Sequence, residues 1–434
     1  MNADIPMSKY SYILFLVFFA FASILPAKSQ YDEFFTPKRF RFDYYIAGSN
    51  DSAYIIPDKL HEEPEWSGSK KNLVDTFRYG EMFFRLLDPA TKTEIFSKGY
   101  SNLFIEWQTT PGAKDTMAKY HECITFPAPL RPVVLEIFMR DTTMAFNRIF
   151  EYIIDPEANN INRTGFSPQT KSKLIHNGNE SHHALDIVFL SEGYTESQCE
   201  LFYTDVERYK NYLFGWEPYK HYRQSINILA VFSASAGEGA DMPGQNFWVE
   251  TIAGAHFSTF GIERYLTLPN ICKVYEHLAA YPVDQVCVLV NSNKYGGGGI
   301  YNFYTIFTSA CAGAEMLFMH EFGHGFASLA DEYFNSEVPY IEFGSRNFEP
   351  YQPNITNMAN FSSKWAGMIN DTVPVPTPDI PEYDNTVGVF EGAFYNTKGF
   401  YRPQRNCAMR SSGTKRFCKV CEAAIEEMLR FSIE

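Results

Sequence analysis

The feature that most constrains this chain is the pair His320 and His324 with Glu321 between them, which forms an HExxH motif. On an α-helix, residues four apart lie on one face, about 6 Å apart along the axis, so both imidazoles can bind one metal ion. Glu321 lies beside the first imidazole, where it can take a proton from metal-bound water. The motif therefore predicts a zinc site on a helix. The alternative is a helix whose histidines only form hydrogen bonds or face solvent.

A third protein ligand must come from outside the motif. Asp331 lies seven residues after His324, which on an uninterrupted helix is about 10.5 Å further along the axis. A short aspartate cannot reach back over that distance, so the helix must end between Gly325 and Ala330 if Asp331 is the ligand. Glu332 and a carboxylate from a later helix are the alternatives.

The N-terminus is typical of an export signal. Lys9 precedes an apolar run over residues 12–25, and Ala27 and Ser29 are small residues at positions that a signal peptidase reads. The run is shorter than the roughly 20 apolar residues that span a bilayer. We expect cleavage after Ser29 and a secreted or periplasmic protein, with an uncleaved membrane anchor as the alternative.

The chain is acidic, with 37 Lys and Arg against 51 Asp and Glu and a formal net charge of −14. Removal of residues 1–29, which hold two lysines and one aspartate, makes this charge slightly more negative. Such a surface repels nucleic acid, so no nucleic-acid partner is expected. No later stretch resembles a membrane span.

Residues 30–155 are expected to form a β-sandwich. Apolar and polar residues alternate over 39–44, and a turn separates the apolar segments 82–87 and 93–96. Further short strands are expected at residues 103–107, 123–126 and 133–139. Short strands without long helical patterns are typical of a sandwich. The predicted sandwich contains no group of residues typical of a catalytic site. We expect it to be an accessory or substrate-positioning domain, with a passive spacer as the alternative.

The pattern changes after a polar segment, 156–180, which is expected to be a linker. Continuous apolar strands are expected at residues 185–190, 226–232 and 285–290, with helical patterns between them. This alternation predicts an α/β domain over 181–434 with a largely parallel sheet. The fold class is therefore multidomain, mixed α+β and α/β, with a β-sandwich followed by an α/β catalytic domain that carries the HExxH helix.

A glycine run over residues 296–299 precedes the HExxH helix. It lacks the Lys-Ser/Thr of a P-loop, so phosphate binding is not expected. We expect Gly297 and Gly298 to leave room for a substrate backbone. The preceding segment 286–291 is then expected to pair with an extended peptide.

Three cysteines lie close together near the C-terminus. Cys418 and Cys421 form a CxxC pair, and Cys407 precedes them. A CxxC can be half of a zinc site, but no second CxxC or nearby histidine pair completes one. In an exported chain we therefore expect a disulfide between Cys407 and either Cys418 or Cys421.

The sequence around the motif resembles a known family. Residues 320–333 are similar to the signature of the bacterial immunoglobulin-A peptidase family of zinc metallopeptidases, in which HExxH continues through an apolar stretch to Asp-Glu-Tyr. The resemblance covers about residues 180–434. Its further matching segments are residues 186–194, 295–299, 406–410 and 417–421.

The resemblance implies a zincin-type fold, a Zn²⁺ cofactor, the metal ligands His320, His324 and Asp331, and the catalytic base Glu321. The family also commonly carries an N-terminal β-domain. Ser328 stands where many relatives have glycine, before the turn that Asp331 requires.

Further residues are candidates for supporting roles. The chain is not an ordinary metzincin, because Ala327 and Ala330 stand where that group has glycine and histidine. Met409 is a candidate for a Met-turn beneath the metal, with core packing as the alternative. The candidates for stabilising an oxyanion are Tyr333, Tyr401 and Arg410.

These observations together predict a secreted zinc metalloendopeptidase that acts on a protein or peptide substrate through zinc-bound water activated by Glu321. One alternative is an exported binding module with a degenerate zinc site, which recognises host glycoprotein or glycan. The intact Glu321 weighs against it, because a site without catalysis needs no base. A zinc amidase or deacetylase is the other alternative.

Overall fold

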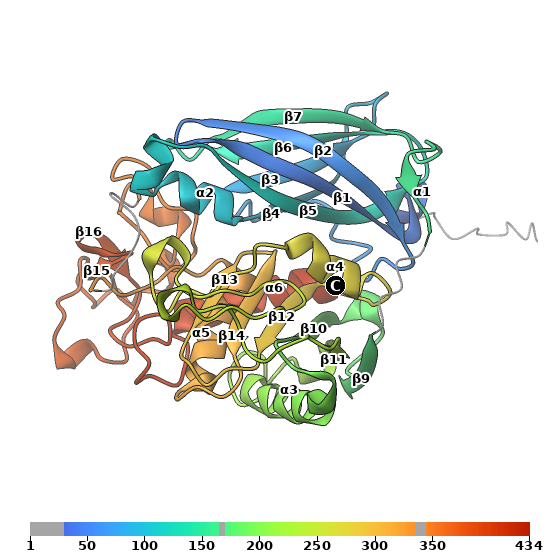
Figure 1. Cartoon of the computed structure of the whole chain (residues 1–434). Coiled ribbons are helices and arrows are strands. Elements are labelled where there is room, and N and C mark those ends of the chain that lie inside the picture. Colours follow the sequence, from blue (N-terminus) through green and yellow to red (C-terminus); the bar gives the residue numbers. More distant parts are fainter. Residues whose placement is uncertain (1–29, 165–169, 336–343) are drawn as a thin grey trace, which may run out of the picture.

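The computed structural model describes residues 30–164, 170–335 and 344–434. The export signal expected at residues 1–29 lies outside the described residues. Figure 1 shows a β-sandwich, formed by the N-terminal strands, stacked against a mixed α/β part that contains the remaining large sheet. The fold is thus mixed α/β, as expected.

Two four-stranded sheets form the sandwich after the short helix α1 (Gln30–Phe34). Their inner faces share one hydrophobic core, in which Phe84 of one sheet meets Phe126 of the other with ring centroids 6.2 Å apart. In order, the first sheet contains β5 (Ala118–Pro129), β1 (Phe35–Ser49), β2 (Ser52–Glu63) and β8 (Ile161–Asn162). The second contains β4 (Glu94–Tyr100), β3 (Met82–Leu87), β6 (Val133–Arg140) and β7 (Phe146–Ile154).

One expected strand of the sandwich is a helix. Residues 103–107 lie in α2 (Leu103–Gln108), where the side chain of Asn102 caps the first turn by accepting from the Ile105 N–H at 3.1 Å. Leu103 packs in the core of the α/β part, whereas Phe104 packs in the core of the sandwich. The strand prediction was wrong because this capped turn is anchored by apolar side chains in two different cores.

The large sheet has four parallel strands in its centre and an antiparallel strand at each edge. Its order is β13 (Gly297–Ile300), β14 (Tyr304–Thr308), β12 (Gln285–Val290), β10 (Leu185–Glu192), β11 (Ile226–Phe232) and β9 (Lys171–His176). Within the segment 156–180, which was expected to be a linker, the described residues contribute β8 to the sandwich and β9 to this sheet.

The four parallel strands of the large sheet are buried on both faces, whereas the edge strand β9 is mostly exposed. Along β10, Ile187 and Phe189 enter one core while Val188 and Leu190 enter the other, because successive side chains of a strand point to opposite faces. The first core also contains α3 (Cys199–Leu213), α5 (Ala314–Ala327) and α6 (Lys419–Ile433). The second contains α4 (Ile271–Leu278). A hairpin of β15 (Phe390–Ala393) and β16 (Asn396–Arg402) precedes α6.

The sandwich packs directly on the α/β part. Arg39 is buried, pairs with Glu63 at 2.6 Å and donates to the Tyr281 carbonyl at 3.4 Å across the interface. Nearby, the Asn302 side chain donates to the Gly99 carbonyl at 2.9 Å. These buried polar contacts fix the orientation of the two parts. Among the described residues, no helix is long and apolar enough to cross a membrane.

Candidate active site

Helix α5 carries the HExxH motif and is mostly buried. Phe318 and Phe322 are fully buried in the core beneath the sheet. His320 and His324 keep 18% of their side chains exposed and line a cavity. Residues four apart share a helix face, so the two imidazoles leave the helix on the same side. Their ring centroids are 4.7 Å apart.

The helix ends at Ala327, within the interval that a third ligand at Asp331 requires. Ser328 adopts a left-handed conformation with φ of 52°, and its N–H donates to the His324 carbonyl at 3.1 Å. The next N–H, of Leu329, donates to the Gly323 carbonyl at 3.2 Å. Glycine adopts this conformation more readily, but here serine makes the same turn.

The turn brings Asp331 back to the two imidazoles. Its Oδ1 atom lies 3.0 Å from His320 Nε2 and 3.3 Å from His324 Nε2, and the two Nε2 atoms are 3.1 Å apart. Tetrahedral zinc with ligand bonds of about 2.0 to 2.1 Å places its ligand atoms about 3.3 Å apart. Among the described residues, the buried Oδ1 atom has no polar partner other than these two imidazoles. The three donor atoms therefore fit one zinc ion.

The other ring nitrogens are held by the backbone. His320 Nδ1 lies 3.0 Å from the Ala408 carbonyl and His324 Nδ1 lies 2.5 Å from the Leu329 carbonyl. A carbonyl accepts only from a protonated nitrogen, so these contacts leave both Nε2 atoms for the metal when the rings are neutral.

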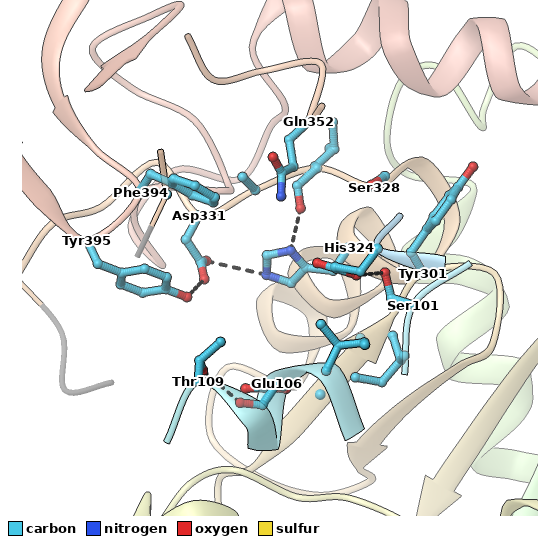
Figure 2. A pocket seen from close by; sticks show the side chains of 18 of the residues that line it. Ser101, Glu106, Thr109, Tyr301, His324, Ser328, Asp331, Gln352, Phe394 and Tyr395 are labelled. Atoms are coloured by element: carbon cyan, nitrogen blue, oxygen red, sulfur yellow. Dashed lines mark hydrogen bonds and ion pairs between the residues drawn. The ribbon is translucent and has the colours of Figure 1, made fainter. Parts of the chain in front are cut away.

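Tyr395 completes this support and was not predicted from the sequence. Its hydroxyl donates to Asp331 Oδ2, and Figure 2 shows the two side chains and His324 pointing toward one another. Tyr395 lies in the turn of the β15–β16 hairpin, where its N–H donates to the Tyr333 carbonyl at 3.0 Å. No local pattern could identify it, because the hairpin reaches the site only through the tertiary fold.

Electrostatics couple Asp331 to the histidines. Burial lowers the pKa of His324, but the charge of Asp331, its hydrogen bond and the charge of Glu321 together raise this pKa to about 9. The pKa of His320 rises for the same reasons. The pKa of Asp331 is held well below its usual range by the two imidazoles, against the effect of burial. Without metal, the positive charge that balances Asp331 thus comes from a proton on His324.

Glu321 lines the same cavity next to His320. Burial raises its pKa, although the two imidazoles act in the opposite direction. The strand β13 lies against this part of the helix. A Cβ atom on Gly297 would come within 2.9 Å of Glu321 Cγ and 2.9 Å of Leu317 Cδ1. The glycine at 297 therefore makes room for the side chain of Glu321.

The structure corrects one part of the predicted substrate role of the glycine segment, the pairing of a peptide with residues 286–291. The segment 286–291 cannot pair with a peptide along β12, because β12 lies between β10 and β14 and both its edges are occupied. At Gly297, the N–H donates to the Arg264 carbonyl at 3.3 Å and the carbonyl accepts from Leu266 at 3.2 Å. Gly297 and Gly298 both line the cavity, but the backbone of Gly297 is already engaged.

The other candidate residues divide into two groups. Tyr333 and Arg410 line the cavity, and the Tyr333 ring stacks against His320 at 6.2 Å. Tyr401 is not among the described residues that line it. It lies on β16, where its N–H donates to the Thr356 carbonyl at 2.8 Å.

Met409 lies beneath α5. It is fully buried, and a Cβ atom on Gly323 would come within 2.9 Å of its sulfur. Its carbonyl accepts from the Glu332 N–H at 2.8 Å, and the carbonyl of the preceding Ala408 orients His320. The segment around Met409 therefore supports both the helix and the residue that follows Asp331.

The cavity has a volume of about 1090 Å³ and is lined by both parts of the chain. From the sandwich come residues such as Glu106 and Arg140, which face His320 and Asp331 of the α/β part. Arg264, which also lines it and was not predicted, forms a hydrogen bond with Tyr333. The sandwich is thus one wall of the site.

Two protein-family models match the chain. A family model described as IgA Peptidase M64 matches residues 173–383 and 379–429, and one described as Peptidase M64 N-terminus matches residues 30–151. The chain belongs to the IgA peptidase M64 family. This M64 peptidase is accordingly a hydrolase of the metallopeptidase class, and the resemblance seen in its sequence is confirmed. A comparison with curated proteins gave no match.

Proposed function

We propose that this M64 peptidase is an exported zinc endopeptidase, with His320, His324 and Asp331 as metal ligands and Glu321 as general base. The observation that carries the proposal is the convergence of two Nε2 atoms and one Oδ1 atom at separations of 3.0 to 3.3 Å. Two nitrogens and one carboxylate oxygen are a donor set of catalytic zinc sites, which keep the fourth position open.

When bound, a zinc ion supplies a Lewis acid that polarises the peptide carbonyl and lowers the pKa of water to about 7. Glu321 takes the proton from the attacking water and then delivers it to the nitrogen of the leaving amine. Its burial serves this exchange, because a raised pKa makes the protonated form easier to reach. Tyr333 and Arg410 line the cavity where they can donate to the developing oxyanion.

The form of the cavity supports a peptide substrate. Its volume of about 1090 Å³ lies just above the usual range for small-molecule pockets, and the cavity continues from the proposed metal ligands to α2 of the sandwich. A chain that lies across both parts would be held on each side of the cleaved bond. This favours cleavage within a chain.

The test compares the wild type with Glu321→Gln on casein, gelatin and a peptide library. We expect chelator to abolish wild-type cleavage and zinc to restore it. Glu321→Gln should lower kcat by about 10² to 10⁴-fold with unchanged zinc content. Glu315→Gln is the matched control, because Glu315 begins the same helix but binds Lys415 and Trp216 away from the site.

Two outcomes would favour the alternative functions. Release of acetyl or amide groups from glycan or cell-wall material, without cleavage of any protein or peptide, would indicate a zinc amidase or deacetylase. Binding of a glycoprotein with no turnover of any of these substrates would indicate a binding module.

A further inference from the structure

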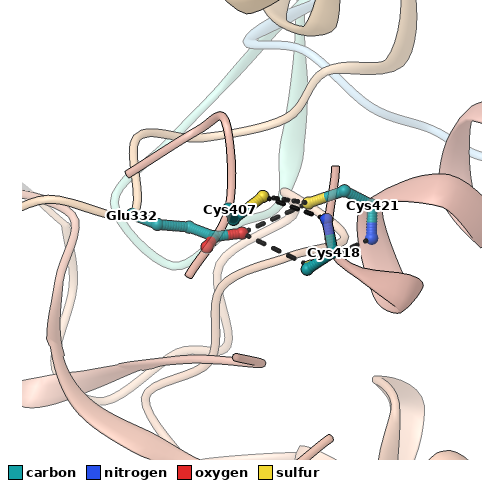
Figure 3. A group of neighbouring side chains, drawn as sticks. All are labelled: Glu332, Cys407, Cys418 and Cys421. Carbon is teal, nitrogen blue, oxygen red and sulfur yellow. Dashed lines mark hydrogen bonds between the residues drawn. The ribbon is translucent and has the colours of Figure 1, made fainter. Parts of the chain in front are cut away.

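A second cluster of metal-binding side chains lies behind the candidate active site. The sulfur atoms of Cys407, Cys418 and Cys421 and a carboxylate oxygen of Glu332 all lie within 4.8 Å of one another. Figure 3 shows the four side chains converging on one point. All four residues are buried, with exposed fractions between 0% and 2%.

The separations between these atoms differ from those of a disulfide. The three cysteines are free, and the sulfurs of Cys407 and Cys421 are 3.8 Å apart, whereas a disulfide bond is about 2.0 Å long. Tetrahedral zinc with Zn–S bonds of about 2.3 Å places two sulfur ligands about 3.8 Å apart. The disulfide expected from the sequence is therefore not formed in this structure.

The carboxylate of Glu332 occupies the position of a fourth ligand. Its Oε1 atom lies 3.2 Å from the sulfur of Cys421 and 3.9 Å from that of Cys418. A tetrahedral site with three sulfurs and one oxygen gives a sulfur–oxygen separation of about 3.5 Å, between these two values. A disulfide would not use this carboxylate.

The surroundings of Glu332 leave its charge in need of a partner. Asn354 donates to Oε1 at 3.0 Å, but the buried Oε2 atom has no hydrogen-bond partner among the described residues. The charge of the buried Arg402 acts favourably on Glu332, but the terminal nitrogens of Arg402 donate to Asp379 and to the carbonyls of Glu391 and Gly392. Burial of a carboxylate that no cation contacts directly is costly.

The local backbone suits thiolates. Cys418 is the N-cap of the 15-residue helix α6, where the helix dipole stabilises negative charge. The N–H of Cys418 points to the sulfur of Cys407 at 3.2 Å, and the N–H of Cys421 points to the sulfur of Cys418 at 3.5 Å. Such N–H···S contacts orient sulfur ligands in the way that outer-shell hydrogen bonds orient metal ligands.

We propose that Cys407, Cys418, Cys421 and Glu332 bind a second zinc ion in a closed, four-coordinate structural site. Thiolate ligands select zinc among the common divalent ions, and four protein ligands leave no position for a substrate. The ion would be distinct from the one at the HExxH motif.

The second ion would brace the candidate active site. Glu332 directly follows Asp331, and its N–H donates to the Met409 carbonyl at 2.8 Å. Cys407 directly precedes Ala408, whose carbonyl orients His320 at 3.0 Å. One ion therefore ties together the segment that presents the carboxylate ligand and the segment that orients a histidine ligand.

Metal analysis of the full chain tests the proposal without any measurement of peptide cleavage. We expect about two zinc ions per chain in the wild type and about one in the double variant His320→Ala/His324→Ala. The double variant Cys418→Ser/Cys421→Ser should lose the second ion. Cys199→Ser is the control, because this half-buried thiol lies outside the cluster and its loss should leave about two.

Cobalt substitution tests the second site even if the cysteine variant does not fold. The variant His320→Ala/His324→Ala keeps the whole thiol cluster, and its cobalt form should show the thiolate-to-metal charge-transfer absorption. Adding Glu332→Gln to this variant should retain that absorption but weaken cobalt binding by about tenfold or more, because one of the four ligands is lost.

Either of two results would contradict the proposal of a second zinc site. One is a histidine variant that holds no metal and shows no charge-transfer absorption. The other is a disulfide between Cys407 and Cys418 or Cys421 in the unreduced wild type, found by mass spectrometry of its peptides. Neither result bears on the proposed peptidase activity, which is tested separately through Glu321.

Discussion

The hydroxyl of Tyr395 offers the sharpest test of how the candidate metal site is built. It donates to Asp331 Oδ2, while the other oxygen, Oδ1, faces the two imidazoles. Tyr395→Phe removes this hydrogen bond and the one between Tyr395 and Tyr333, and it keeps the ring, which packs edge-on to Tyr333 with centroids 5.4 Å apart. The perturbation therefore acts on the orientation and charge of one proposed ligand and on the hydroxyl of Tyr333 beside it.

The magnitude follows from the charge on the acceptor. A hydrogen bond to a charged group contributes about 1.5 to 3 kcal/mol, and 1.4 kcal/mol corresponds to a tenfold change in Kd. We therefore expect Tyr395→Phe to raise the Kd for zinc by about 10 to 100-fold, the range found for outer-shell partners of metal ligands. With zinc in excess, kcat should fall less than tenfold, because Glu321 is unaltered.

Competition with a chelator of known affinity measures the zinc Kd, and peptide cleavage at saturating zinc measures kcat. Tyr295→Phe is the matched control, because this tyrosine lines the same cavity but is 45% exposed. An unchanged Kd together with a kcat lowered by about 100-fold or more would refute the reasoning. Tyr395 would then act on the substrate rather than on Asp331.

Two further predictions concern the helix end and the protons of the site. Ser328→Gly should raise the free energy of unfolding by about 0.5 to 1 kcal/mol, because relief of the left-handed strain exceeds the entropy that glycine adds to the unfolded chain. Denaturant unfolding measures this change. The control is Ser412→Gly, at an exposed position without positive φ, which should give no gain. Zinc binding should release at least one proton at pH 7, because the pKa of His324 is about 9 in the metal-free site and the metal displaces its proton. Above pH 9, His324 is already mostly neutral, so fewer protons should be released. Calorimetry in buffers of different ionisation enthalpy measures this release, and equal proton counts at pH 7 and pH 10 would contradict it.

The sequence by itself determined the features that depend on neighbouring residues. The spacing of His320 and His324 placed both imidazoles on one face of a helix, because the period of a helix is local. The apolar runs of β11 (Ile226–Phe232) and β12 (Gln285–Val290) gave the bounds of two buried strands for the same reason. The motif that extends to Tyr333 indicated the family.

Only the tertiary structure decided how distant segments meet. The left-handed Ser328 turns Asp331 back to the histidines, and the β15–β16 hairpin supplies Tyr395 from 64 positions further along the chain. The position of β12 in the middle of the sheet excludes the peptide pairing that its sequence suggested. Glu332 joins the three C-terminal cysteines across 75 to 89 positions, which no CxxC spacing could indicate. These contacts depend on packing between elements, whereas sequence patterns report the conformation within one element.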